Sequence, residues 1–176
     1  MTDHPVLFVI GAHGSGKSTL GRTMQERHGW RHLSVGDLHR LGRRGKLPQG
    51  ISLRLMLCIT NATPGRHMDE QTATALLSQI DAWRRDAPVI VDGFPTLPSH
   101  MERGPVRSAI VHVHCDGAAR EPRLLLRSKQ TCRKWTPGLS SERDLGLEEL
   151  LHHARKLPRF KEIDNNAGLD ALAHDA

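Results

Sequence analysis

The feature that most constrains the fold is a glycine-rich stretch that directly follows a short apolar run. Val6 to Ile10 is apolar throughout, which is typical of a buried strand in a parallel sheet. The next eight residues, Gly11 to Ser18, follow the pattern G-x-x-x-x-G-K-[ST] without a gap. A helical pattern continues from Lys17 to about His28, where Gly29 ends it. A strand, a tight glycine turn and a helix in this order predict a loop that wraps around an anion.

The residues of this turn have the chemistry that a polyphosphate requires. Glycines let main-chain N–H groups point inward around a phosphate, and the following helix presents its positive dipole end to the same anion. The lysine ammonium would span the β and γ phosphates, and the serine hydroxyl would ligate Mg²⁺. We therefore assign ATP binding to the loop and the first turn of the helix, that is, to Gly11, His13, Gly14, Ser15, Gly16, Lys17, Ser18 and Thr19.

An aspartate ends another apolar run, Val89 to Val91. An acidic side chain at the carboxyl end of a parallel strand faces the crevice where α/β sheets bind ligands. We expect Asp92 to hold Mg²⁺ through water, together with the Ser18 hydroxyl. Because Asp92-Gly93 is also a common turn dipeptide, a purely structural role is the alternative. The glycine turn and Asp92 predict a nucleoside triphosphate site and leave the acceptor open.

Strand and helix patterns alternate along the whole chain. Apolar runs at 6–10, 88–91 and 109–114 are typical of strands, two further short strands are expected at 31–34 and 159–163, and helical patterns separate the five. Residues 51–83 are helical in pattern with a break at 62–65, and 145–157 and the stretch from Leu169 onward are also expected to be helical. The sequence therefore predicts one α/β domain over residues 1–176, with a parallel five-stranded sheet, helices on both faces and the three-layer P-loop NTPase fold.

The composition of the chain indicates which kinds of partner to expect. No apolar stretch reaches the roughly 18–20 residues of a membrane span and no secretory signal is evident, so a cytoplasmic protein with no membrane contact is expected. The net charge is +6 and most cations are arginine, which suits a phosphate-rich partner. Aromatic residues make up 3% with no tyrosine, which disfavours a base-stacking surface. A nucleotide rather than a nucleic acid is the expected partner, and a monomer is the default.

Three further segments resemble the adenylate kinase family of nucleoside monophosphate kinases. Leu33–Arg40 resembles the family's S-T-G-D-L-L-R, Asp92–Pro95 resembles its D-G-F-P-R, and Gly65–Glu70 resembles its G-x-x-V-x-D-E. Their order and separations agree with the family, and the resemblance covers about residues 6–157. It implies transfer of the γ-phosphoryl group of ATP to a nucleoside monophosphate with Mg²⁺ present. It also implies an acceptor-binding helical insert over about 35–85 and a short lid over about 128–142.

The resemblance also implies roles for individual residues. Arg40 corresponds to a clamp on the acceptor phosphate, and Arg123 and Arg127 correspond to a pair that lies over the donor adenine and contacts its phosphates. The implied acceptor-binding residues are Ser34, Gly36, Arg40, Asp92, Gly93 and Phe94. The implied catalytic residues, which surround the transferred group with positive charge, are Lys17, Arg127, Arg143 and Arg155.

Two departures from the family pattern concern the acceptor. Thr96 stands where the family has an arginine after Asp-Gly-Phe-Pro, and Ser99 falls where the family has a glutamine that reads adenine. A site that loses such a hydrogen-bonding partner can change its discrimination by orders of magnitude. The alternatives are therefore a P-loop kinase of another small molecule, such as a sugar, an acid or a nucleoside, and a nucleotide-binding regulatory protein with little turnover.

Overall fold

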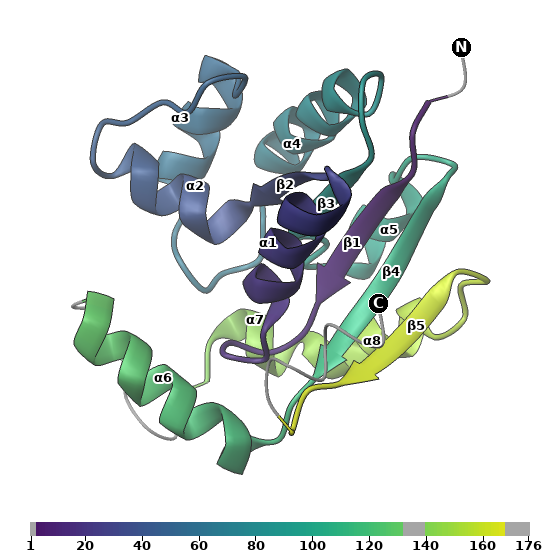
Figure 1. Ribbon diagram of the computed structural model, residues 1–176. Helices are drawn as coiled ribbons and strands as arrows, with labels where there is room; N and C mark the ends of the chain where they lie inside the picture. The colour runs from purple at the N-terminus through teal and green to yellow at the C-terminus, as the bar shows by residue number, and fades with distance from the viewer. Residues whose placement is uncertain (1–2, 132–139, 168–176) are drawn as a thin grey trace.

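The computed structural model describes residues 3–131 and 140–167, which form a parallel sheet with helices on both faces (Figure 1). In this part of the chain the sheet has five strands, β1 (Val6–Ile10), β2 (Arg31–Ser34), β3 (Val89–Asp92), β4 (Ser108–His114) and β5 (Phe160–Asp164). Their spatial order is β2-β3-β1-β4-β5, and every neighbouring pair is parallel. The predicted three-layer P-loop fold is confirmed, and each strand lies within one residue of its predicted bounds.

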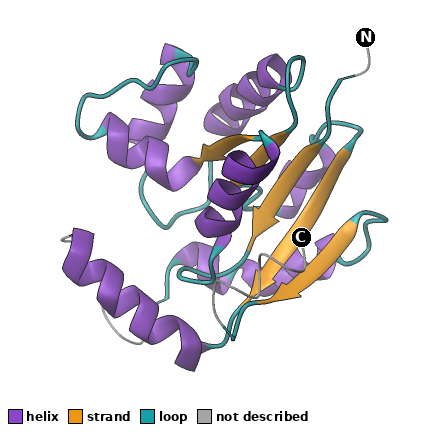
Figure 2. Cartoon of the chain, viewed as in Figure 1, coloured by secondary structure: helices purple, strands orange, loops and turns teal. Residues whose placement is uncertain are grey.

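Helices lie on both sides of the sheet (Figure 2). Their bounds are α1 (Lys17–His28), α2 (Val35–Gly42), α3 (Leu53–Asn61), α4 (Glu70–Trp83), α5 (Pro98–Glu102), α6 (Gly117–Thr131), α7 (Glu142–Leu145) and α8 (Leu147–Ala154). Helix α1 covers one face, whereas α4 and α8 cover the other. Helices α2 and α3 pack together beside β2, and α6 projects away from the sheet where β4 ends (Figure 1).

Strand β1 is apolar on both faces because each face is covered. On β1, Phe8 packs into the large cluster that also contains Leu76 of α4 and Leu151 of α8. Its neighbour Val9 points the opposite way, into the smaller cluster with Leu20 of α1. Successive side chains of a strand alternate between faces, so a strand that is covered on both faces is apolar at successive positions. This is the physical reason for the uniform apolar run of β1 in the sequence.

Helix ends follow local chemistry. The Ser34 hydroxyl caps α2 by accepting the main-chain N–H of Asp37 at 3.3 Å, and Asp69 caps α4 by accepting the N–H of Thr72 at 2.8 Å. The predicted break in residues 51–83 is wider than expected, from Ala62 to Asp69. The predicted helix at 145–157 corresponds to α8, and a separate short helix, α7, precedes it with Gly146 between the two.

Some predictions fall on residues that the structure does not describe. Most of the predicted lid, 132–139, and the predicted helix after Leu169 lie outside the described residues. The short helix α5 was not predicted from the sequence. In the ranges 3–131 and 140–167, no helix has the length and apolar composition needed to cross a bilayer.

Two leucines of α3 provide a matched test of this packing. Leu55 is 0% exposed and Leu57 is 55% exposed, and both lie inside the same helix. We expect Leu55→Ala to lower the free energy of unfolding by about 3–5 kcal/mol, because it removes buried methyl groups and leaves a cavity. Leu57→Ala should lower it by less than about 1 kcal/mol. Urea unfolding monitored by circular dichroism measures both values, and equal losses would contradict this placement of α3.

Candidate active site

The glycine-rich loop curls between the end of β1 and the start of α1. Gly14 has φ 81, in the left-handed region that favours glycine, and a Cβ there would lie 2.9 Å from the Leu124 side chain of α6. A Cβ on Gly11 would lie 2.5 Å from the carbonyl oxygen of Val113 on β4. The glycines therefore allow the loop to approach its neighbours closely, as well as to turn.

The Lys17 ammonium lies inside the curl of this loop. Its Nζ donates to the carbonyl oxygens of Gly11 at 2.7 Å and Ala12 at 2.6 Å. Burial lowers the pKa of Lys17 to about 8, while the nearby Asp92 carboxylate opposes the shift. The ammonium is therefore mostly charged at pH 7, and it lies where main-chain amides of the same loop can share an anion with it.

Asp92 is a buried carboxylate at the end of β3. It accepts hydrogen bonds from Nε2 of His32 at 2.7 Å and from the hydroxyl of Ser34 at 3.1 Å. His32 and Ser34 project from the same side of β2, and the strand register places Ser34 opposite Asp92. Burial raises the pKa of Asp92, but the bond and charge of His32 and the charge of Lys17 outweigh it, so the pKa lies below its usual value. Asp92 is therefore ionised at neutral pH.

A cavity of about 1000 Å³ opens over the loop and the carboxyl ends of β1 and β3. From β1 the chain first forms β2 and β3 on one side of β1, and it then crosses to form β4 and β5 on the other side. Open α/β sheets bind ligands at such a switch point. The volume is at the upper end of the roughly 300–1000 Å³ of small-molecule sites, which leaves room for two ligands.

Most of the predicted site residues line this one cavity. From the predicted donor and catalytic sets they are Gly11, His13, Gly14, Gly16, Lys17, Ser18, Thr19, Arg123, Arg127 and Arg143. From the predicted acceptor set they are Ser34, Gly36, Arg40, Asp92 and Gly93. Their proximity is a finding, whereas their individual roles stay predictions.

Three predicted site residues do not line this cavity. The Ser15 side chain is buried, and the main-chain N–H of Ser15 donates to the carbonyl oxygen of Ala12 at 3.2 Å. Phe94 is 0% exposed because its ring is a core side chain, packed edge-on against Phe8 with 5.6 Å between ring centroids. Arg155 caps the far end of α8, where its guanidinium pairs with Glu162 of β5 at 3.4 Å. The structure thus corrects the placement of these side chains.

Three arginines of the cavity form bonds with neighbouring residues. Arg40 forms an ion pair with Asp37 one turn earlier on α2. Arg123 donates to the main-chain oxygen of Asn165 at 2.9 Å. Arg143 donates to the carbonyl oxygen of Gly93 at the end of β3. Guanidinium groups fixed in this way present their remaining donors to a ligand with less loss of side-chain entropy.

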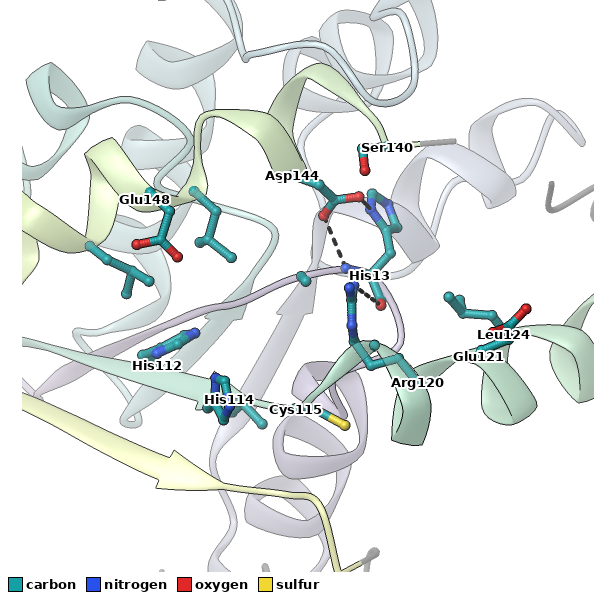
Figure 3. A pocket seen from close by; sticks show the side chains of 15 residues that line it. His13, His112, His114, Cys115, Arg120, Glu121, Leu124, Ser140, Asp144 and Glu148 are labelled. Atoms are coloured by element: carbon teal, nitrogen blue, oxygen red, sulfur yellow. Dashed lines mark hydrogen bonds and ion pairs between the residues drawn. The ribbon is translucent and has the colours of Figure 1, made fainter. Parts of the chain in front are cut away.

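Three polar residues at the site were not singled out from the sequence. Asp144 of α7 binds His13, and Arg120 of α6 donates to the His13 carbonyl oxygen at 3.1 Å (Figure 3). His32 is the third, through its bond to Asp92. The alternation of His32 with Ser34 on a predicted strand was a usable signal, since both must project to one side. Asp144 and Arg120 lie more than 100 positions from His13 and left no comparable local signal.

Thr96, which replaces an arginine of the resembled family, is a buried residue. Its hydroxyl oxygen accepts the main-chain N–H of Met68 at 2.9 Å. This bond joins the segment after β3 to the turn that precedes α4. Thr96 also lines the cavity, so the protein presents a neutral side chain at this position.

Comparison with known proteins places this site in a family. The AAA domain family matches residues 7–146, from β1 to the end of α7. The chain is similar to the adenylate kinase of Novosphingobium aromaticivorans, at 28% identity over 97 residues, which are 54% of this chain and 43% of that protein. It is also similar to an adenylate kinase of Bacteroides fragilis, at 28% identity over 135 residues, 72% of this chain and 69% of that protein. The match thus spans less than half the length of the first relative.

Solved structures agree on the fold. A gluconokinase from Sinorhizobium meliloti 1021 aligns with a TM-score of 0.50 at 18% identity, over 93% of this chain and 84% of that one. A proposed kinase from Chloroflexus aurantiacus aligns with a TM-score of 0.56 at 20% identity, over 94% and 90%. At this identity the likeness shows the P-loop kinase fold alone. Since the family match covers most of the residues, the chain belongs to the AAA domain family, as an adenylate kinase-like P-loop protein.

Proposed function

We propose that this protein transfers the γ-phosphoryl group of ATP to a small anionic acceptor, with a nucleoside monophosphate as the first candidate. The observation that supports this most directly is one cavity whose cations come from separate elements. Lys17 begins α1 directly after the loop, Arg40 lies on α2 and Arg143 lies on α7. Two phosphate-bearing ligands that meet end to end need cations on both sides of the transferred group.

The distribution of charge also favours an anionic acceptor. Residues 38–68, which include most of α2 and all of α3, contain six of the 25 lysines and arginines and none of the 19 acidic residues. The rest of the chain has equal numbers of each, so the formal charge of +6 belongs to this segment. A positive region beside a cleft attracts anions and raises their rate of association.

Phosphoryl transfer requires little covalent chemistry from the protein itself. Phosphoryl transfer depends on alignment of the two reactants and on positive charge around the transferred oxygens. Lys17 and Arg143 would supply that charge, and Arg40 would orient the acceptor phosphate bidentately. A phosphate oxygen is already an anionic nucleophile, so the proposed acceptor needs no general base.

One residue of α1 and one at the end of β3 fit a magnesium ion bound with ATP. The Ser18 hydroxyl and the ionised Asp92 carboxylate both line the cavity, and the Ser18 side chain bonds that carboxylate. Mg²⁺ prefers oxygen ligands and takes one or two from the protein, with phosphate oxygens and water for the rest. The ion would offset the negative charge of the β and γ phosphates.

A second candidate is a kinase that phosphorylates a hydroxyl group of another small molecule. Thr96 favours it, because no cation stands at that position of the acceptor side. A hydroxyl acceptor needs a base, and the carboxylates of Asp37 and Asp92 both line the cavity.

The cytoplasmic location and the monomeric state stay predictions from the sequence.

Lys17→Met tests the donor site. We expect it to lower ADP formation by about 100-fold or more, because the ammonium is proposed to stabilise charge that develops on the transferred group. Lys46→Met removes an exposed lysine and should leave the rate within about twofold. A coupled ADP assay with a panel of nucleoside monophosphates, sugars and sugar acids gives the class of acceptor. ATP consumption that is the same with and without every acceptor would refute phosphotransfer and favour a regulatory nucleotide-binding protein.

Arg40→Ala tests the acceptor side. We expect the KM for the acceptor to rise about 10- to 100-fold and the KM for ATP to change by less than about threefold, because a charge-assisted bond to one ligand is lost. Arg43→Ala is the control, because Arg43 is an exposed arginine at the end of the same helix. Steady-state kinetics with each substrate varied separate the two constants. A matching rise in both would refute the assignment of Arg40 to the acceptor.

Asp92→Asn tests the magnesium site. It keeps the shape of the side chain and removes its charge, so we expect the magnesium concentration for half-maximal rate to rise about 10- to 100-fold. Asp81→Asn changes an exposed carboxylate of α4 and should leave this concentration unchanged. Titration of the rate with MgCl₂ at saturating ATP measures the magnesium concentration for half-maximal rate. An unchanged titration for Asp92→Asn would place the ion elsewhere.

A further inference from the structure

A side-chain contact joins the glycine-rich loop to α7, across 131 positions of sequence. Oδ1 of Asp144 accepts the main-chain N–H of His13 at 3.1 Å, and Oδ2 lies 2.9 Å from Nδ1 of the His13 ring (Figure 3). The Ser141 hydroxyl also donates to Oδ2, at 3.0 Å. One carboxylate thus receives three donors, two of them from the same residue of the loop.

This carboxylate is stabilised by these bonds despite its burial. The Asp144 side chain is 19% exposed. Burial raises the pKa of Asp144, but the hydrogen bonds and charge of His13 outweigh it and hold the pKa far below its usual value. Removal of the His13 ring would take one of three donors from this partly buried carboxylate, which costs stability because a partly buried charge is incompletely solvated.

The pair forms a wall between two cavities. His13 and Asp144 line the large cavity and also a second cavity of about 440 Å³. The second cavity extends from the pair toward His112 and His114 of β4 and Glu148 of α8 (Figure 3). Leu124 of α6 and Leu147 of α8 line both cavities as well, so the pair and these two leucines separate the cavities.

Arg143 precedes Asp144 on the same short helix. Its main-chain N–H donates to the carbonyl oxygen of Gly65 at 3.1 Å, and its guanidinium reaches Gly93. A helix of four residues has almost no stability of its own, so tertiary contacts must hold α7 in place. A shift of Asp144 away from His13 would therefore shift Arg143 as well.

We propose that His13 and Asp144 are positioning residues, which hold α7 against the loop so that Arg143 stays at the cleft. The role assigned to Arg143 rests on the proposed phosphotransfer, but the contact itself does not. The pair makes the position of the guanidinium depend on the conformation of the ATP-binding loop. A rival account is that the pair contributes to overall stability and has no specific effect on Arg143.

Hydrogen–deuterium exchange tests the contact without any turnover. In His13→Ala we expect the main-chain amides of residues 142–146 to exchange about 10-fold faster or more, because a charge-assisted bond that holds α7 is lost. In His13→Asn, whose carboxamide N–H can donate to the carboxylate, exchange should return toward the wild-type rate. Glu149→Gln, an exposed carboxylate change on α8, is the control and should leave it unchanged. Wild-type exchange in His13→Ala would overturn the proposal.

A double-mutant cycle tests the route through Arg143. Asp144→Ala should lower kcat about 10- to 100-fold and change the KM for ATP by less than about threefold, as expected for misplacement of a catalytic group. In an Arg143→Ala background, the same substitution should cause no further loss of kcat. Independent, multiplicative losses would overturn the proposal and support a purely stabilising role. Absence of ADP formation by the wild type with every acceptor would refute the proposed function, and exchange would then decide the contact alone.

Discussion

The cleft depends on the way the loop between β1 and α1 folds around the Lys17 ammonium. Two carbonyl oxygens of the loop, those of Gly11 and Ala12, accept from this ammonium, and glycines allow β4 and α6 to approach the loop closely. A buried ammonium without partners would lose its charge, but here main-chain oxygens and the Asp92 carboxylate retain it. The same fold orients the amides of the loop toward an anion. Stability and phosphate binding therefore rely on one arrangement.

The sheet register connects this loop to a second polar centre. Asp92 is ionised although it is buried, because His32 and Ser34 on the neighbouring strand donate to it. Buried polar networks stabilise a structure only when their members are satisfied. β2 and β3 thus position a carboxylate beside the lysine before any ligand binds. A site built on strands in this way has little freedom to shift, which suits a reaction that depends on alignment.

The sequence predicted the donor side of the site better than the acceptor and catalytic side. The residues of the glycine pattern are contiguous in sequence, so they lie close together in the fold. Of their side chains, only that of Ser15 is buried away from the cavity. Phe94 was assigned to the acceptor by its motif, but an aromatic ring between a strand and a helical layer is more stable in the core. Arg155 was assigned by approximate spacing. Arg155 lies at the C-terminal end of α8, where it pairs with Glu162 of β5.

The sequence by itself determined the five strands, the order of layers and the phosphate-binding loop, because each depends on residues that are neighbours in the chain. An apolar run with alternating faces, a cap or a glycine turn is a local pattern with a local physical cause. Only the tertiary structure decided that Asp144 meets His13, that His32 holds Asp92 and that Arg143 reaches Gly93. These contacts join segments 50 or more positions apart, and a polar side chain carries no pattern that identifies a distant partner. The folded sheet brings such partners together, and burial then makes their pairing obligatory.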